Sequence, residues 1–187
     1  SMVQTIQQQD LPQWVAPLLD LCREAGEAIC EHYHAPAAAD YESKQDDSPL
    51  TLAALASHAI LQAGLISLDA TVPVLSEESV PADIIHRRQW PRYWLIDPLD
   101  GTKEFLERTG EFTINIALID DHRPIMGLLY LPLARVAYVG IPGQLAQRYT
   151  DTGDGAWSVC ELVPPLLQPD QPLVVMASRR HHGDRLQ

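Results

Sequence analysis

The chemistry of this chain is concentrated in six consecutive residues, Asp-Pro-Leu-Asp-Gly-Thr, which begin at Asp97. Hard cations such as Mg2+ bind oxygen ligands, and the carboxylates of Asp97 and Asp100 can supply them together with the backbone carbonyl of Leu99. Gly101 lets the backbone approach a ligand closely. Thr102 adds a hydroxyl at the expected start of a helix, where unpaired amides and the helix dipole favour a phosphate. The hexapeptide therefore indicates a divalent-metal site that handles phosphate.

Two short apolar runs lead into acidic residues, and each predicts a strand that carries acids at its end. The run at residues 93–96 leads into Asp97, and Pro98 is expected to end that strand because proline cannot donate a ladder hydrogen bond. The run at residues 73–76 leads into Glu77 and a second glutamate. Three acids from two strand ends could surround one ion.

A simple turn is the alternative interpretation of the hexapeptide, because Asp, Pro and Gly are the usual turn formers. Short motifs of this kind also arise by chance. The second acidic motif, which ends at Glu78, favours the metal site over the turn.

Composition and charge exclude two classes of partner. The chain has 187 residues, 46% of them hydrophobic, and its 13 basic and 25 acidic residues give a formal charge of −12. Because it has no run of Lys or Arg, we expect no binding to nucleic acid or to an anionic membrane surface. We also expect no apolar span long enough to cross a membrane and no N-terminal signal. A phosphate-ester substrate therefore needs a metal ion to offset charge repulsion.

Three cysteines, Cys22, Cys30 and Cys160, are too few and odd in number for a disulfide framework. We expect all three to pack in the core. A reducing cytoplasm is the expected location, with a peripheral position at the inner membrane as the alternative.

Periodicity predicts helices first and strands after. Apolar residues at helical spacing predict helices at residues 11–33 and 51–68, the first of them starting near Pro17. Alternation and turn signals predict strands at residues 41–44, 112–118, 125–131, 136–141, 145–149 and 173–176. This order indicates an α+β layered domain with an antiparallel meander sheet.

The acidic motifs carry a resemblance to a known family. Glu77-Glu78 followed by the hexapeptide resembles the lithium-sensitive, Mg2+-dependent phosphatase superfamily that includes inositol monophosphatases and fructose bisphosphatases. The four residues that follow Gly101, Thr-Lys-Glu-Phe, are similar to those of CysQ-type 3'(2'),5'-bisphosphate nucleotidases, where inositol monophosphatases usually have Thr-Thr-Asn-Phe. The segments at residues 43–51 and 110–118 fit the same subfamily.

The resemblance implies a layered sugar-phosphatase fold. Its N-terminal part has two long helices packed on an antiparallel meander sheet, which we expect as a metal-binding domain over residues 1–163. Residues 164–187 are expected to begin a C-terminal α/β domain that is largely missing from this chain.

The resemblance also implies a metal centre with two or three Mg2+ ions. Glu77 and Asp97 bind the first ion with the Leu99 carbonyl, and Asp97 bridges to a second ion held by Asp100. Such ions activate a water and neutralise charge on the phosphoryl group, which is transferred in line to water. Glu78 is expected to support this centre without ligating directly.

Phosphate and substrate contacts are implied at neighbouring positions. The amides of Gly101 and Thr102 hold phosphate oxygens, and the Thr102 hydroxyl orients the attacking water. Lys103 offsets phosphate charge, and the alternative is a solvated surface lysine. Lys44 has the same two interpretations. Ser178, His181 and His182 are implied to contact the substrate, and the alternative for them is an exposed polar tail. A structural role is the favoured interpretation of His58 on the second helix.

Two departures from the family pattern reduce the expected activity. Relatives carry Thr-x-Ala-Asp at the start of the second helix, and Ala54 stands at that Asp position, where it cannot help to activate water. Loss of general-base help typically costs roughly a hundredfold to ten-thousandfold in rate, unless Asp46 or Asp47 replaces it. Relatives also continue into a second domain with a Trp-Asp-x-Ala-Ala motif, whose Asp completes the second metal site.

Three functions follow from this resemblance. The leading one is Mg2+-dependent hydrolysis of the small phosphorylated nucleotide 3'-phosphoadenosine 5'-phosphate to AMP and phosphate in sulfate assimilation, impaired by Ala54 and the missing part. An inositol or sugar monophosphatase is the alternative enzyme. A catalytically inactive metal- or nucleotide-binding descendant is the alternative of another class, and a homodimer is one expected assembly.

We expect this chain to melt at a low temperature or to oligomerise, because the absent layer leaves an apolar sheet face exposed. Mg2+ is expected to raise the melting temperature, since a ligand that binds only the folded state stabilises it. Thermal unfolding with and without Mg2+, followed alongside the molecular mass in solution, tests both points. A high, metal-independent and strictly monomeric transition contradicts them.

Overall fold

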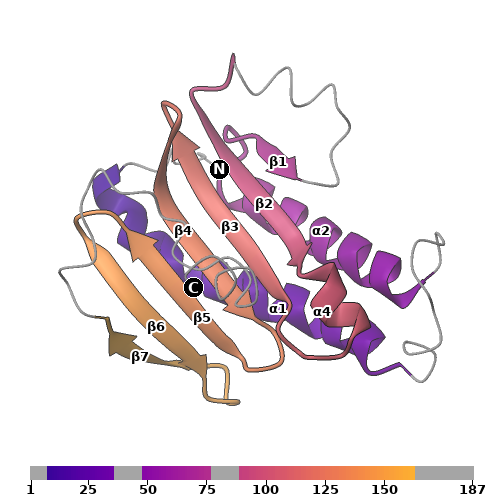
Figure 1. Cartoon of the computed structure of the whole chain (residues 1–187). Helices are drawn as coiled ribbons and strands as arrows, with labels where there is room; N and C mark the ends of the chain where they lie inside the picture. Colours follow the sequence, from indigo (N-terminus) through magenta and orange to yellow (C-terminus); the bar gives the residue numbers. More distant parts are fainter. Residues whose placement is uncertain (1–7, 36–47, 77–88, 163–187) are drawn as a thin grey trace, which may run out of the picture.

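A seven-stranded sheet covered on one face by two long helices is the frame of the molecule (Figure 1). The computed structural model describes residues 8–35, 48–76 and 89–162. Its helical elements are η1 (Gln8–Trp14, a 3-10 helix), α1 (Val15–Tyr33), α2 (Pro49–Leu68) and the short α4 (Thr102–Leu106). Its strands are β1 (Val74–Ser76), β2 (Arg92–Asp100), β3 (Thr113–Asp120), β4 (Arg123–Leu131), β5 (Val136–Ile141), β6 (Leu145–Asp151) and β7 (Trp157–Glu161).

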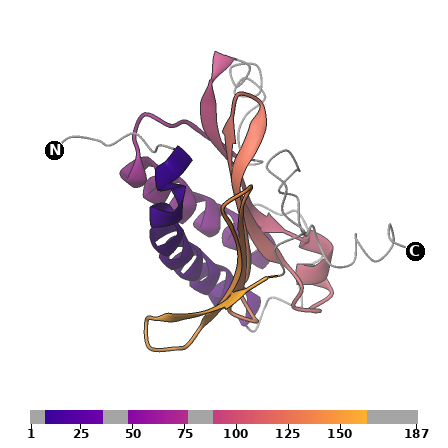
Figure 2. The ribbon, with the colours of Figure 1, turned by 90° about the vertical axis from the view of Figure 1, so that its left-hand side faces the viewer.

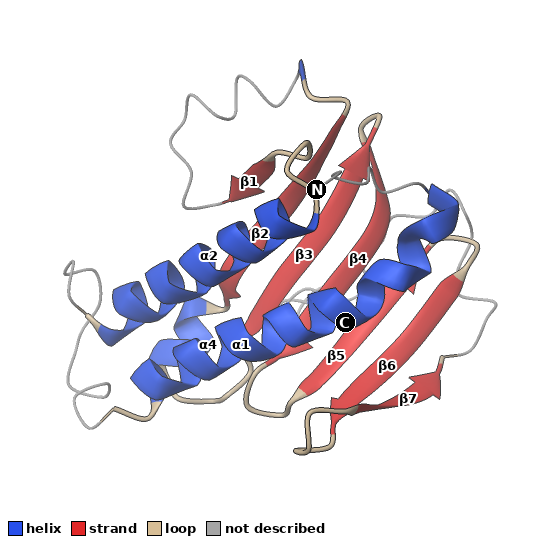
Figure 3. Cartoon of the chain, turned by 180° about the vertical axis from the view of Figure 1, so that it is seen from behind, coloured by secondary structure: helices blue, strands red, loops and turns tan. Residues whose placement is uncertain are grey.

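The sheet is a meander with one exception. Its strands lie in chain order from β1 to β7, and every neighbouring pair from β2 onward is antiparallel. β1 pairs with β2 in parallel, and its last residue, Ser76, lies opposite Ile96. Figures 2 and 3 show α1 and α2 side by side on one face of this sheet. The predicted α+β layered fold is therefore confirmed.

Both predicted helices are present, with small shifts at their starts. Pro12 lies in the 3-10 turn η1, and α1 begins two residues before Pro17, which occupies its first turn. α2 begins at Pro49, because Ser48 caps it: the Ser48 Oγ accepts a hydrogen bond of 3.1 Å from the Thr51 N–H.

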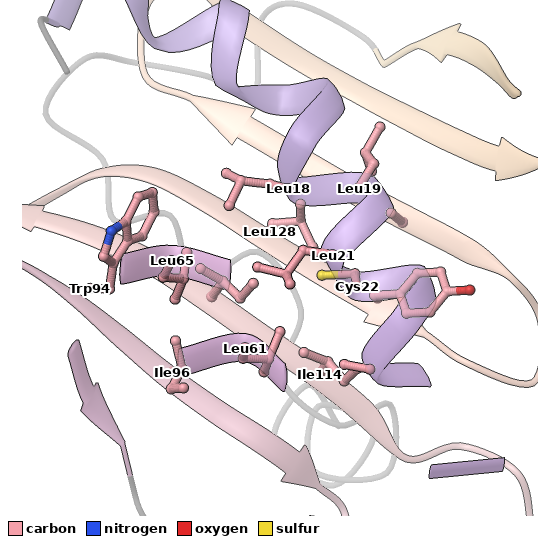
Figure 4. Packing of buried hydrophobic residues seen from close by; sticks show 14 of the residues in the cluster. Leu18, Leu19, Leu21, Cys22, Leu61, Leu65, Trp94, Ile96, Ile114 and Leu128 are labelled. Atoms are coloured by element: carbon pink, nitrogen blue, oxygen red, sulfur yellow. The ribbon is translucent and has the colours of Figure 1, made fainter. Parts of the chain in front are cut away.

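The core lies between these helices and the sheet (Figure 4). Strand alternation turns Trp94 and Ile96 of β2 toward the helices, where they are at most 1% exposed. The helices approach each other so closely that a Cβ on Gly64 of α2 would lie 2.3 Å from Leu21 Cδ1 of α1. Further buried members of this layer are Leu18, Leu19, Cys22, Leu61, Leu65, Ile114 and Leu128.

The prediction that Pro98 ends its strand is wrong. β2 continues through Pro98 to Asp100, and its register with β3 shifts between Asp97 and Asp100. Such a bulge accommodates proline, because the missing N–H falls where the ladder is already interrupted. The two carboxylates therefore belong to the last four residues of β2 and do not lie in a turn beyond the strand.

Other strand predictions differ in their bounds. β5 has the predicted bounds, whereas β4 begins at Arg123 and β6 extends to Asp151. β7 was not predicted, because its five residues show no strong alternation. The strands predicted at residues 41–44 and 173–176 lie outside the described residues, as do all residues from 163 to 187.

The prediction that all three cysteines pack in the core is wrong for Cys160. Cys22 is buried and Cys30 is partly buried, whereas Cys160 is exposed on the edge strand β7. Burial raises the pKa of the Cys22 thiol and is the main cause of the raised pKa of Cys30, so neither thiol favours the reactive thiolate.

One helix corrects the expectation that no apolar span could reach across a membrane. α2 is long and apolar enough to do so by length and composition, which is a weak indication because core helices meet the same test. In the structure α2 packs on α1 and β2. Leu52, Leu55 and Ile66 are exposed on α2.

A buried carboxylate ties the far end of the sheet to α1. The side chain of Asp151, at the end of β6, has no exposed surface and forms ion pairs with Arg23, at 2.9 Å, and with Arg135. The Gly153 N–H donates to its other oxygen at 2.8 Å. Arg23 also stacks on Trp157 of β7, with its Cζ 4.4 Å from the ring centroid. This cluster holds the last hairpin against the helical layer.

Asp151→Asn is expected to lower the free energy of unfolding by about 2 kcal/mol at pH 7, less than for a fully buried pair because both arginines are partly exposed. Burial alone raises the pKa of Asp151, but the Gly153 N–H and the two guanidinium groups outweigh it and hold the pKa below its usual value. The stabilisation is therefore fully present above the ordinary aspartate pKa of about 4 and is lost as the pH falls through the lowered native pKa.

Urea unfolding at a series of pH values measures this difference. Asp154→Asn is the matched control, since Asp154 is exposed in the next turn and its replacement is expected to change stability by less than about 0.5 kcal/mol. Equal losses for the two variants at pH 7 would contradict the role of the Asp151 cluster.

Candidate metal and phosphate site

The predicted site residues lie where β2 ends and α4 begins. In the β2–β3 register Asp97 faces Asn115 and Asp100 faces Thr113, while Pro98 and Leu99 occupy the bulge between these pairs. Asp97 and Asp100 are both partly exposed, whereas Leu99 is 5% exposed. The structure thus places Asp97, Leu99 and Asp100 at one end of β2, which lies between β1 and β3 in the sheet.

Asn115 orients one of these carboxylates. Its Nδ2 donates to the Asp100 Oδ2 at 3.0 Å, and its Oδ1 lies 3.5 Å from the Thr113 hydroxyl that donates to it. A carboxylate held by a neutral amide keeps its negative charge available for a cation. Sequence reasoning did not single out Asn115, because its importance depends on the register between two strands.

Gly101 makes the sharp connection from β2 to α4. Its φ of 91° lies in the left-handed region, and a Cβ there would lie 3.2 Å from both the Phe112 Cα and the Glu104 Oε2. Glu104 is only 2% exposed, while Thr102 and Lys103 are exposed. Thr102 and Lys103, which follow the two aspartates in sequence, are therefore accessible from solvent.

Two further residues at this end of the sheet come from α2. The Ser57 Oγ donates to the Pro98 carbonyl at 2.7 Å, and Ser57 is completely buried. His58 Nδ1 and Ser76 Oγ share a hydrogen bond of 3.0 Å. Ser57 was missed by sequence reasoning, although a polar residue in the buried apolar stripe of a helix is a detectable signal. The favoured structural role of His58 agrees with its contact to the end of β1.

The donors on β2 suit a hard divalent cation. Asp97, Asp100 and the Leu99 backbone offer oxygen only, which is the ligand chemistry of Mg2+. Within the described ranges no three His, Cys, Asp or Glu side chains gather in a way that could hold a metal ion. The predicted ligand Glu77 and its neighbour Glu78 lie outside these ranges, so the complete ligand set stays a prediction.

Of the other residues that the sequence analysis singled out, the structure describes Ala54. Ala54 is partly buried on α2 and packs against the core, so its position offers only a methyl group. The following lie outside the described residues: Lys44, Asp46, Asp47, Ser178, His181 and His182.

The sequence profile of the inositol monophosphatase family matches residues 10–182. The chain belongs to the inositol monophosphatase family. The resemblance inferred from the acidic motifs is thereby confirmed, and the layered fold with two long helices on a meander sheet agrees with that of solved family members.

Relatives within the inositol monophosphatase family point to one subfamily. The chain is 43% identical over 168 residues to the 3'(2'),5'-bisphosphate nucleotidase CysQ of Salmonella typhimurium, covering 89% of this chain and 63% of that protein. It is 50% identical over 124 residues to CysQ of Escherichia coli, covering 66% and 50%. The chain therefore spans about half to two thirds of the length of these relatives.

Solved structures of family members are similar as well. CysQ from Bacteroides thetaiotaomicron superposes with a TM-score of 0.64 at 32% identity, covering 92% of this chain and 55% of that one. Inositol monophosphatase II from Staphylococcus aureus gives a TM-score of 0.59 at 26% identity, covering 71% and 47%.

Gly101→Ala is expected to lower the free energy of unfolding by about 1–3 kcal/mol, because alanine is strained at this φ and its Cβ meets the Phe112 backbone. Gly153→Ala is the matched control, since Gly153 has a φ of 87° but a Cβ added there would have no neighbouring atom within 4 Å. We expect Gly153→Ala to lower the free energy of unfolding by about 1 kcal/mol, from backbone strain alone. Denaturant unfolding followed by circular dichroism measures both, and equal losses would show that crowding at Gly101 has no effect.

Proposed function

We propose that this chain is part of a Mg2+-dependent phosphomonoesterase that hydrolyses 3'-phosphoadenosine 5'-phosphate to AMP and phosphate, a reaction that supports sulfate assimilation. The observation that carries this proposal is the bulged end of β2, which places Asp97, Leu99 and Asp100 directly before the left-handed Gly101. The identity of 43–50% to proteins named CysQ supports the choice of substrate.

The proposed metal ligands are Glu77, Asp97, the Leu99 carbonyl and Asp100. Mg2+ bound there would supply an activated water and would neutralise charge on the phosphoryl group and its leaving oxygen. Asn115 supports this assignment, because its uncharged amide donates a hydrogen bond that fixes one oxygen of Asp100. The formal charge of −12 makes such neutralisation necessary for a substrate that carries two phosphates.

The proposed phosphate contacts are the backbone amides of Gly101 and Thr102 and the side chain of Lys103. The exposed Thr102 hydroxyl is proposed to orient the attacking water, since it follows Asp100 by two residues and faces solvent. Ser178 and His181 are proposed to contact the nucleotide. Their assignment rests on the family resemblance alone.

Ala54 is proposed to limit turnover. It lies three residues before Ser57 on α2, and residues at this spacing are neighbours on a helix surface. A carboxylate at position 54 would therefore lie on the part of α2 that contacts the Pro98 region. Because alanine cannot accept a proton, a second candidate function is a binding protein for metal or nucleotide without catalysis.

We also propose a cytoplasmic location. The alternative of a peripheral position at the inner membrane is not part of the proposal, because α2 has an apolar exposed face but carries no Lys or Arg to attract anionic lipid. A homodimer stays a prediction.

Ala54→Asp is expected to raise phosphate release from 3'-phosphoadenosine 5'-phosphate by roughly a hundredfold or more, because it restores a base near the proposed water. The measurement is the phosphate released with Mg2+ by the wild-type chain and by the variant. Ala54→Asn is the control, because asparagine has the shape of aspartate but no basic carboxylate, and we expect no increase in phosphate release from it.

Three outcomes separate the candidate functions. Activity that appears only in Ala54→Asp, and disappears when Asp97→Asn is added, supports an impaired nucleotidase. A preference for inositol monophosphate over the nucleotide contradicts the proposed substrate. Activity in none of the variants points either to the part of the relatives that this chain does not cover or to the binding protein.

A further inference from the structure

α2 holds both strands that lead into the acidic motifs, and it does so with two consecutive residues. Ser57 contacts the Pro98 carbonyl of β2, and His58 contacts the Ser76 hydroxyl at the end of β1. The two strands run in parallel, and Ser76 is the residue directly before Glu77 in the sequence. One turn of one helix therefore touches the ends of both strands.

The hydrogen bond from Ser57 fixes a segment of β2 that is not paired in the β2–β3 register. Pro98 has no N–H, and the β2–β3 register includes Asp97 and Asp100 but skips Pro98 and Leu99. The carbonyl of Pro98 is thus the one strong backbone hydrogen-bonding group of this residue. Ser57 engages it at 2.7 Å in a completely buried position, where a hydrogen bond is well shielded from water.

Without the Ser57 hydrogen bond, the backbone of the bulge could rotate more freely, and this would change the relative positions of the two aspartates. The Pro98 carbonyl belongs to the peptide that joins Pro98 to Leu99, so fixing it restricts the rotation of the neighbouring backbone. Asp97 precedes that segment and Asp100 follows it. Outer contacts of this kind hold ligands in a binding geometry before the ion arrives, and they lower the ordering cost of binding.

We propose that Ser57 and His58 are positioning residues of the metal centre, which hold the bulge of β2 and the end of β1 in the arrangement that binds a divalent cation. This inference rests on the proposed function, because it assumes that Asp97 and Asp100 bind the ion. It assigns to α2 a role in metal affinity that is separate from its role in the core.

The test is calorimetric titration of the whole chain with Mn2+ as the probe, without substrate. Ser57→Ala is expected to bind Mn2+ about tenfold more weakly than the wild-type chain, the lower end of the range for outer contacts of metal ligands. Ser57→Thr, which keeps the hydroxyl, is expected to retain most of the affinity. His58→Ala is expected to weaken binding, and His58→Asn, which can still bond Ser76, to restore it.

Ser48→Ala is the matched control for a purely structural effect. Ser48 is also buried and hydrogen-bonded next to α2, but its side chain bonds Thr51 within the helix and caps it. We expect this variant to lower the melting temperature and to leave the Mn2+ affinity unchanged. Circular dichroism melts of all variants separate folding from binding.

The outcomes distinguish this inference from the function on which it rests. Mn2+ binding by the wild-type chain with the same affinity in Ser57→Ala overturns the positioning role and leaves the metal centre in place. Equal weakening by Ser57→Ala and Ser48→Ala also overturns it, because a general loss of α2 stability then explains both. Absence of Mn2+ binding in the wild-type chain removes the metal centre and its positioning residues together.

Discussion

Burial of one side of β2 under α2 is the constraint on which the site depends. Successive side chains of a strand point to opposite faces, so fixing Trp94 and Ile96 in the core also fixes the direction of Leu95 and Asp97. A slip of one residue would place Asp97 among apolar helix residues and Ile96 in solvent. The large cost of burying an unpaired carboxylate therefore makes the core packing specify where the acids lie.

The bulge of β2 lets a proline and two acids coexist at a strand end. Regular alternation would turn Asp97 and Asp100 to opposite faces, since they are three residues apart. The shifted register changes this relation and brings Asp100 beside Asn115, which bonds it. Ser57 then donates a hydrogen bond to the Pro98 carbonyl, in the segment that the β2–β3 register skips. Sheet irregularity, helix contact and amide contact thus act on the same four residues.

The described part of the chain keeps the family scaffold, and Ala54 stands where the family resemblance implies a base. Ala54 is an excellent helix residue that packs against the core, so the change costs the fold little while it removes the base expected in the family. The Asp151 cluster, far from this site, stabilises the last hairpin independently of any metal. The proposed turnover therefore depends on side chains other than those that stabilise the last hairpin, which is why variants that restore or remove single side chains are informative.

The sequence by itself determined the two helices, most of the strands, the family and the acidic hexapeptide, because periodicity, caps and short motifs are local properties. It failed at Pro98, where local propensity predicted a strand end but pairing with β3 carries β2 on to Asp100. It also missed β7, Asn115 and Ser57. Only the tertiary structure decided these features, because each depends on a partner distant in sequence: 15 residues separate Asn115 from Asp100, and 41 separate Ser57 from Pro98. No local pattern contains the register and helix packing that bring such pairs together.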